Sequence, residues 1–208
     1  MTAARGRHAP PPEVRLPLQR ERLLRAAACE FARRGYAGAS SESISRAAGM
    51  SKATFYEHFA NKEECMLALF DLGAEVVTES MITAAQGAPQ DAGERMRAGA
   101  RAFLGALSAH PEFAQTLLVE IIGAGPRAAQ QRDAMLGRFA AVLDAENAEA
   151  ARRGLSGRFA SPHDAFAVVG AIAELVSRQL RNGVPAEIAA LAPVIERLIM
   201  ALIPDAGP

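Results

Sequence analysis

Apolar side chains recur every three or four positions along most of this chain, with polar and charged side chains between them. This spacing is typical of amphipathic α-helices, and we find no alternating pattern of the kind that marks a β-strand. Prolines and glycines stand at or near the expected helix ends. We therefore predict an all-α protein, with helices at residues 18–34, 40–48, 51–58, 62–85, 91–109, 111–123, 127–153, 162–182 and 185–203.

The stretch SSESISRAAGMSKATFYEHFANKEE, from Ser40 to Glu64, predicts two short helices joined by a tight turn. Ser40 or Ser41 can cap the first helix, because its side-chain oxygen accepts from an unpaired amide of the first turn. Gly49 can end that helix in the left-handed conformation, and Ser51 can cap the second helix two residues later. So short a connection makes the two helices cross steeply, which is helix-turn-helix geometry.

The second of these helices has an apolar side and a polar side. Phe55 and Phe59 are four residues apart and are expected to point inward. The outer side carries a cation, a hydroxyl, a phenol and an imidazole, which are groups that hydrogen-bond phosphates and base edges. These groups belong to Lys52, Thr54, Tyr56 and His58. Asn61 and Glu64 form a capping-box-like start to the next helix, with Lys62 in its first turn.

The segment AAGMSKATFYEHFANKEE resembles the DNA-binding signature of the TetR (tetracycline-repressor-like) family of transcriptional regulators. The resemblance extends back through EFARRGYAGASSESIS and covers roughly residues 20 to 66. It implies that Lys52, Ala53 and Thr54 face base edges. The phosphate-binding residues it implies are Ser40, Tyr56, His58 and Lys62, and Ser51 completes the expected DNA-binding set.

Charge is distributed unevenly, although the net charge of the chain is zero. Residues 1–62 carry 11 Lys and Arg against 5 Asp and Glu, a net +6, and the remaining residues carry 12 against 18, a net −6. A basic N-terminal part suits a polyanion such as double-stranded DNA. We predict a disordered basic arm at 1–17, a three-helix, helix-turn-helix DNA-binding domain at 18–62 and a larger helical ligand-binding and dimerisation domain at 63–208.

The last two predicted helices have apolar faces too wide to be covered within one subunit. The first carries two adjacent stripes and the second a single broad one. The stripes are Phe166, Val169, Ala173, Val176 and Leu180 beside Val168, Ile172 and Leu175, and then Ile188, Leu191, Ile195, Leu198 and Leu202 with Val194 and Ile199. We expect a homodimer, and the resemblance implies that these helices pair into a four-helix bundle.

The resemblance also implies a cavity for a small-molecule effector among the middle helices. The candidate ligand-binding residues are Phe103, Phe113, Leu117, Glu120, Phe139, Phe166 and Glu174, with His110 as a further polar candidate. Each aromatic side chain could equally be ordinary core, and Arg101 or Arg178 could pair with the carboxylates without any ligand. A signal from this cavity is expected to reach the DNA through helix 62–85 or its contacts with the middle helices.

Other function classes account for less of the sequence. We see no metal-binding spacing, glycine-rich phosphate loop or Gly-x-Ser-x-Gly motif, so we expect no enzyme, catalytic residue, metal or cofactor. Two cysteines, no apolar signal segment and no apolar run of ~18 residues indicate a cytoplasmic protein without membrane contact. A helical dimeric adaptor would explain the apolar stripes but not the polar outer face. The expected function is a ligand-responsive repressor, and DNA binding without small-molecule sensing stays open.

Overall fold

All regular structure in the described part of the chain is helical. The computed structural model describes residues 11–88, 92–161 and 163–202. The elements in chain order are α1 (Pro12–Gly38), α2 (Ser41–Ala47), α3 (Lys52–His58), α4 (Lys62–Gly87), α5 (Ala92–Ala109), α6 (Pro111–Leu118), the 3-10 turn η1 (Glu120–Gly123), α7 (Pro126–Arg152), α8 (Asp164–Asn182), the 3-10 turn η2 (Ile188–Leu191) and α9 (Ala192–Leu202). The all-α prediction is confirmed for these residues.

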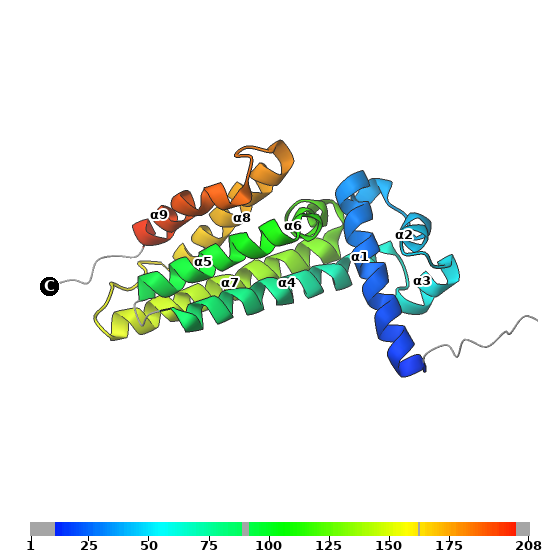
Figure 1. Ribbon diagram of the computed structural model, residues 1–208. Coiled ribbons are helices and arrows are strands. Elements are labelled where there is room, and N and C mark those ends of the chain that lie inside the picture. Colours follow the sequence, from blue (N-terminus) through cyan, green and yellow to red (C-terminus); the bar gives the residue numbers. More distant parts are fainter. Residues whose placement is uncertain (1–10, 89–91, 162, 203–208) are drawn as a thin grey trace, which may run out of the picture.

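The N-terminal domain, α1 to α3, lies at one end of the molecule (Figure 1). α1 lies between α2 and α3 on one side and the remaining helices on the other. Leu23, Ala27 and Phe31 recur every fourth position along α1, and all three are completely buried. Ile44 of α2 and Phe55 of α3 are also completely buried, so three amphipathic elements close one small core.

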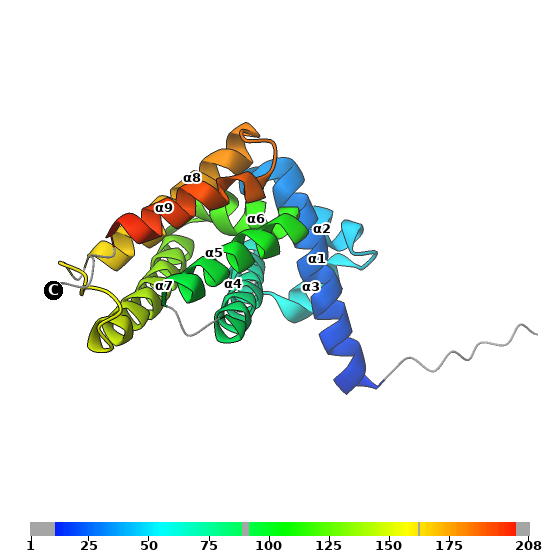
Figure 2. The same ribbon diagram turned by 60° about the vertical axis from the view of Figure 1, so that its left-hand side comes forward.

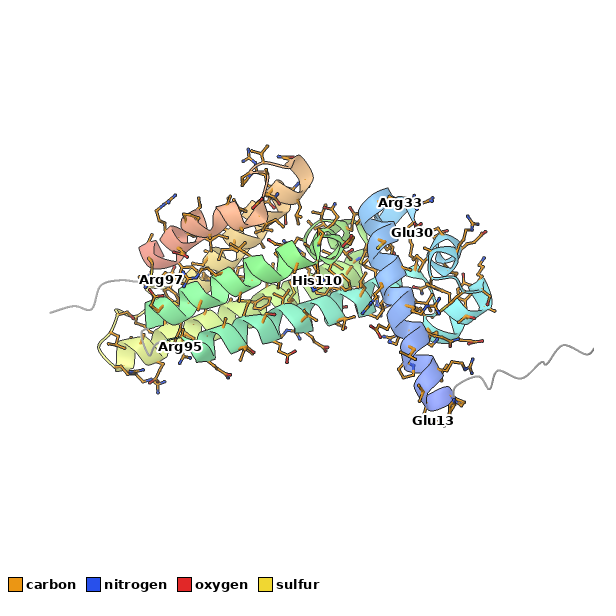
Figure 3. All side chains as sticks on the ribbon, viewed as in Figure 1. Glu13, Glu30, Arg33, Arg95, Arg97 and His110 are labelled. Carbon is orange, nitrogen blue, oxygen red and sulfur yellow. The ribbon has the colours of Figure 1, made fainter. Side chains whose placement is uncertain are left out.

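The C-terminal domain, α4 to α9, is a longer bundle whose helices α4, α5 and α7 run alongside one another (Figure 1). Arg95 on α5 joins α7 through an ion pair with Glu146, at 2.7 Å between nitrogen and oxygen (Figure 3). α8 packs on α7 and α9 packs on α5, and the two lie side by side on the same face of the bundle (Figure 2).

Several predicted boundaries are wrong. α1 begins at Pro12, so residues 12–17 are helical and not a disordered arm, whereas residues 1–10 lie outside the described part. The expected helix 111–123 ends at Leu118 and continues as the tighter turn η1. The expected helix 185–203 is replaced by η2 followed by α9. A proline stands at or beside each expected start, at Pro17, Pro111 and Pro185. Its local preference does not fix where helical geometry begins or ends.

The core runs through both domains without interruption. One connected cluster of buried side chains reaches from Leu23 and Phe55 through Phe70 to Leu104 and Ile195. Val176 of α8, expected on a wide face, is fully buried in this cluster and so faces its own subunit. Within the described residues, we find no helix with both the length and the apolar character needed to cross a bilayer.

Candidate nucleic-acid interface

A capping serine fixes the start of each helix of the helix-turn-helix. The Ser40 hydroxyl accepts from the Ser43 amide and the Ser43 hydroxyl accepts from the Ser40 amide, each at 3.1 Å, so α2 begins with a reciprocal capping box. The Ser51 hydroxyl accepts from the Thr54 amide at 3.1 Å and caps α3. Between them Gly49 has a φ of +67°, the left-handed conformation expected of it. The predicted tight turn between the two helices is therefore present.

The outer face of α3 gathers most of the predicted DNA-binding residues. Ser51, Lys52, Ala53 and Tyr56 are exposed, and Thr54 is half-buried with its hydroxyl 3.0 Å from that of Ser51. The Lys52 ammonium lies 5.9 Å from the centre of the Tyr56 ring. This cation, phenol and pair of hydroxyls form one polar surface on a helix whose opposite side is anchored by buried phenylalanines.

His58 is placed differently from these residues. Its imidazole is half-buried, and its Nε2 atom is buried with no hydrogen-bond partner among the described residues. Burial, with a smaller effect from the charge of Arg20, lowers the pKa of His58 below its ordinary value. The lowered pKa favours the neutral form of the ring, which lies at the end of α3 next to the core.

Lys62 is also occupied inside the protein. Its ammonium donates to the carbonyl oxygens of Tyr36, at 2.6 Å, and Ala39, at 3.0 Å, and lies 4.1 Å from the centre of the Tyr36 ring. Burial lowers the pKa of Lys62. An ammonium group has three donors, and two of them serve carbonyls at the end of α1. The predicted phosphate contact would have to use the third.

Two arginines of α1 support the interface, and sequence reasoning did not single them out. The Arg22 guanidinium donates to the carbonyl of Ala48 at 2.7 Å, and so ties α1 to the end of α2. The guanidinium carbon of Arg20 lies 4.6 Å from the centre of the Phe59 ring. The sequence held no signal for either contact beyond the basic charge of this helix.

The candidate ligand-binding residues differ in their exposure to solvent. Leu117 is buried, whereas Phe103, Phe113 and Phe139 are half-buried against the core. Phe166 is 46 % exposed. Glu174 is exposed and pairs with Arg181 at 2.6 Å, not with the arginines suggested from the sequence. His110 is exposed where α5 ends (Figure 3).

Glu120 has partners that involve no ligand. One of its carboxylate oxygens accepts from the backbone amide of Tyr36 at 2.7 Å, and the other accepts from the side-chain amide of Gln115 at 3.1 Å. A carboxylate near apolar helices was expected to need a partner, and it finds one on the N-terminal domain.

The described residues form at least two hollows. One, of about 590 Å³, lies between the N-terminal domain and the helices α4 and α7, with Arg20, His58 and Phe59 on one side and Asp71 and Gln131 on the other. The second, of about 560 Å³, lies between α7 and the start of α8 and includes Phe166. In the described part of the chain no three His, Cys, Asp or Glu side chains converge to form a possible metal site.

Comparison with known proteins identifies this architecture. Residues 23–69 match the family model described as "Bacterial regulatory proteins, tetR family". No curated protein sequence matches the chain at a significant level. Many solved structures share its fold.

Three of these solved structures show how far the similarity extends. FadR from Bacillus subtilis, in complex with stearoyl-CoA, has 20% identity over 86% of this chain and 96% of its own, with a TM-score of 0.77. PfmR from Thermus thermophilus, a TetR family transcriptional regulator, has 23% identity over 86% and 97%, with a TM-score of 0.68. AibR, in complex with isovaleryl coenzyme A and operator DNA, has 20% identity over 90% and 99%, with a TM-score of 0.66.

The match to residues 23–69 covers the whole helix-turn-helix and the start of α4. The structural matches extend over both domains. Residues 23–69 therefore match the tetR family of bacterial regulatory proteins, and the chain as a whole has the fold of solved TetR-family transcriptional regulators such as PfmR.

Proposed function

We propose that this regulator binds a palindromic operator as a homodimer, acts as a repressor and releases DNA when it binds a largely apolar small molecule. The observation that carries the proposal is the exposed polar face of α3, with Lys52 and Tyr56 held outward by the buried side of the same helix. A helix of this size fits the major groove, where such side chains reach bases and phosphates. A regulator of chromosomal DNA would act in the cytoplasm.

Each residue on this face has a proposed role. Lys52, Ala53 and Thr54 stand in the first turn of α3, which is the part of a recognition helix that contacts base edges. Tyr56 and Ser40 are placed to hydrogen-bond phosphates. The half-buried His58 is proposed to support α3, and the internally bonded Lys62 to support the end of α1, each with phosphate contact as a secondary role.

Dimerisation is proposed to use the outer faces of α8 and α9. Phe166 of α8 and Val194 of α9 are 46 % and 39 % exposed, and Leu198 is half-buried. The two helices lie side by side (Figure 2), and the proposal is that these side chains contribute to one surface. A second copy would cover apolar area that a single subunit leaves in water.

The proposed effector is an acyl compound, and the first class to test is the acyl thioesters of coenzyme A. FadR of Bacillus subtilis and AibR were each solved with such a thioester bound. The half-buried Phe103, Phe113 and Phe139 on three helices of the C-terminal domain are the side chains proposed to contact the acyl chain.

The experiment is selection of genomic fragments by the purified protein, followed by affinity measurement at several salt concentrations. We expect a palindrome whose half-sites are about one helical turn, ~34 Å, or a multiple apart. Tyr56→Phe should weaken binding to all sequences, and Lys52→Ala should change the sequence preference. If no palindrome is recovered, operator binding as a symmetric dimer is refuted.

Sensing is tested on the same operator. Acyl thioesters of coenzyme A with short and long chains are titrated into the complex. If a thioester lowers the affinity of the protein for its operator, the result supports a repressor that is released by an acyl effector. If no thioester changes the affinity, the proposed effector class is wrong and DNA binding without this sensing remains.

A further inference from the structure

One side chain of the C-terminal domain bonds directly to the backbone of the N-terminal domain. The Glu120 carboxylate, in η1, accepts the amide proton of Tyr36 at 2.7 Å across 84 positions of sequence. Its second oxygen is held by Gln115 of α6 at 3.1 Å, which fixes the orientation of the carboxylate. A hydrogen bond to a charged acceptor is stronger than one between neutral groups.

The Tyr36 amide is available because α1 breaks immediately before it. Gly35 has a φ of +70° and a ψ of 161°, which is non-helical and interrupts the hydrogen-bond ladder of α1. A side chain at this position would be strained by the positive φ, and its Cβ would lie 3.4 Å from the Glu120 carboxylate. The break therefore both frees the amide and lets the carboxylate approach.

The other side of the same residue leads to the helix-turn-helix. The Tyr36 carbonyl accepts from the Lys62 ammonium at 2.6 Å, and that ammonium also holds the Ala39 carbonyl at 3.0 Å. Ala39 directly precedes Ser40, the cap of α2. Three groups, Glu120, the Tyr36 backbone and Lys62, thus link the body of the protein to the start of the DNA-binding unit.

The link also continues into the C-terminal domain. The buried hydroxyl of Ser177 on α8 shares its proton between two carbonyls, that of Leu118 at 2.9 Å and that of Ala173 in its own helix at 2.7 Å. Leu118 stands two residues before Glu120. α8 is one of the two helices proposed to form the dimer interface. η1 itself is a single 3-10 turn that connects α6 to α7.

We propose that Glu120 is a positioning residue that holds the helix-turn-helix at a fixed angle to the C-terminal domain, and that movement of η1 reaches the DNA through its bond to Tyr36. The inference deepens the proposed function and rests on it. It also corrects the expectation that coupling must pass through helix 62–85 or its contacts with the middle helices, because α6 and η1 contact α1 directly.

The test compares Glu120→Ala, Glu120→Gln and a matched control, Glu112→Ala. Glutamine retains an oxygen that can accept from the Tyr36 amide, whereas alanine removes it. Glu112 is an exposed carboxylate on the neighbouring α6, so its variant loses the same charge from the same region. Operator affinity and amide hydrogen exchange at Tyr36 are measured for wild type and all three variants.

We expect Glu120→Ala to speed exchange at Tyr36 at least about tenfold and to weaken operator binding at least about fivefold, because a loosened domain must be ordered when it binds. Glu120→Gln and Glu112→Ala should stay within about twofold of wild type in both measurements. If the rate of amide exchange at Tyr36 is the same in Glu120→Ala as in wild type, the inference is overturned, whatever the operator affinity.

Failure of the inference and failure of the proposed function give different results. If wild type binds its operator and Glu120→Ala binds it equally well, the positioning role is refuted and the regulator remains. If wild type selects no operator at all, the proposed function fails, and the exchange rate at Tyr36 alone decides whether Glu120 holds the domain.

Discussion

Replacement of Lys62 by alanine separates a structural role from a DNA-binding role. The variant removes two hydrogen bonds from a charged donor and one cation–π contact with Tyr36. Hydrogen bonds from a charged donor contribute ~1.5–3 kcal/mol each to the free energy of unfolding. Because Lys62 is only half-buried, water can bond to the freed carbonyls in the variant and reduce this loss. We expect the free energy of unfolding to fall by about 2–3 kcal/mol, and therefore the Tm to fall by roughly 4–12 °C for a chain of this size.

The assay is thermal unfolding together with operator affinity as a function of salt. If Lys62 acts on the carbonyls alone, the slope of log affinity against log salt should equal that of wild type. A lysine that neutralises one phosphate would instead change this slope by ~0.9. Lys52→Ala is the control, because Lys52 is exposed and its loss should change the free energy of unfolding by no more than about 0.5 kcal/mol. An unchanged Tm in Lys62→Ala, with a flatter salt slope, would refute the structural role.

Two further predictions concern packing and pH. Gly73→Ala would place a Cβ 2.8 Å from a terminal carbon of the buried Leu117, so overpacking should outweigh the gain in helix propensity and destabilise the protein by about 1 kcal/mol in urea unfolding. Gly105→Ala meets no atom within 4 Å and should stabilise it by up to about 1 kcal/mol; equal effects of both variants would contradict this packing. The pKa of His58 is lowered by burial and by Arg20, so the unfolded chain binds this proton more readily. Stability should fall as the pH drops below about 6.5, and His58→Gln should remove that part of the fall in a pH series of unfolding curves.

Local features were readable from the sequence. The caps Ser40, Ser51 and Asn61 each act within three residues, and the structure contains all three. The helix predicted at 51–58 is α3, because a cap, an apolar pair and a following break all agree there. The left-handed Gly49 follows from a short-range steric rule of the same kind.

Contacts between distant parts of the chain were not readable. Nothing in the sequence near Glu120 indicates that its partner is a backbone amide 84 residues away. Likewise, the family resemblance suggested phosphate for Lys62, whereas the fold brings two carbonyls to it first. Apolar periodicity showed that Val176 is buried but not which surface covers it. Periodicity identifies a face of a helix, and only the tertiary structure identifies its partner.

The uninterrupted core has a consequence for how the protein unfolds and how it can be divided. Cys65, Leu69 and Phe70 at the start of α4 are completely buried in the same cluster as Phe55 of α3. A fragment cut at residue 62 would lose these side chains, so the excised helix-turn-helix is expected to be unfolded. The whole chain should melt in a single calorimetric transition. A chimera that borrows another DNA-binding unit would have to exchange the first three turns of α4 with it, because those turns complete the core of both halves of the molecule.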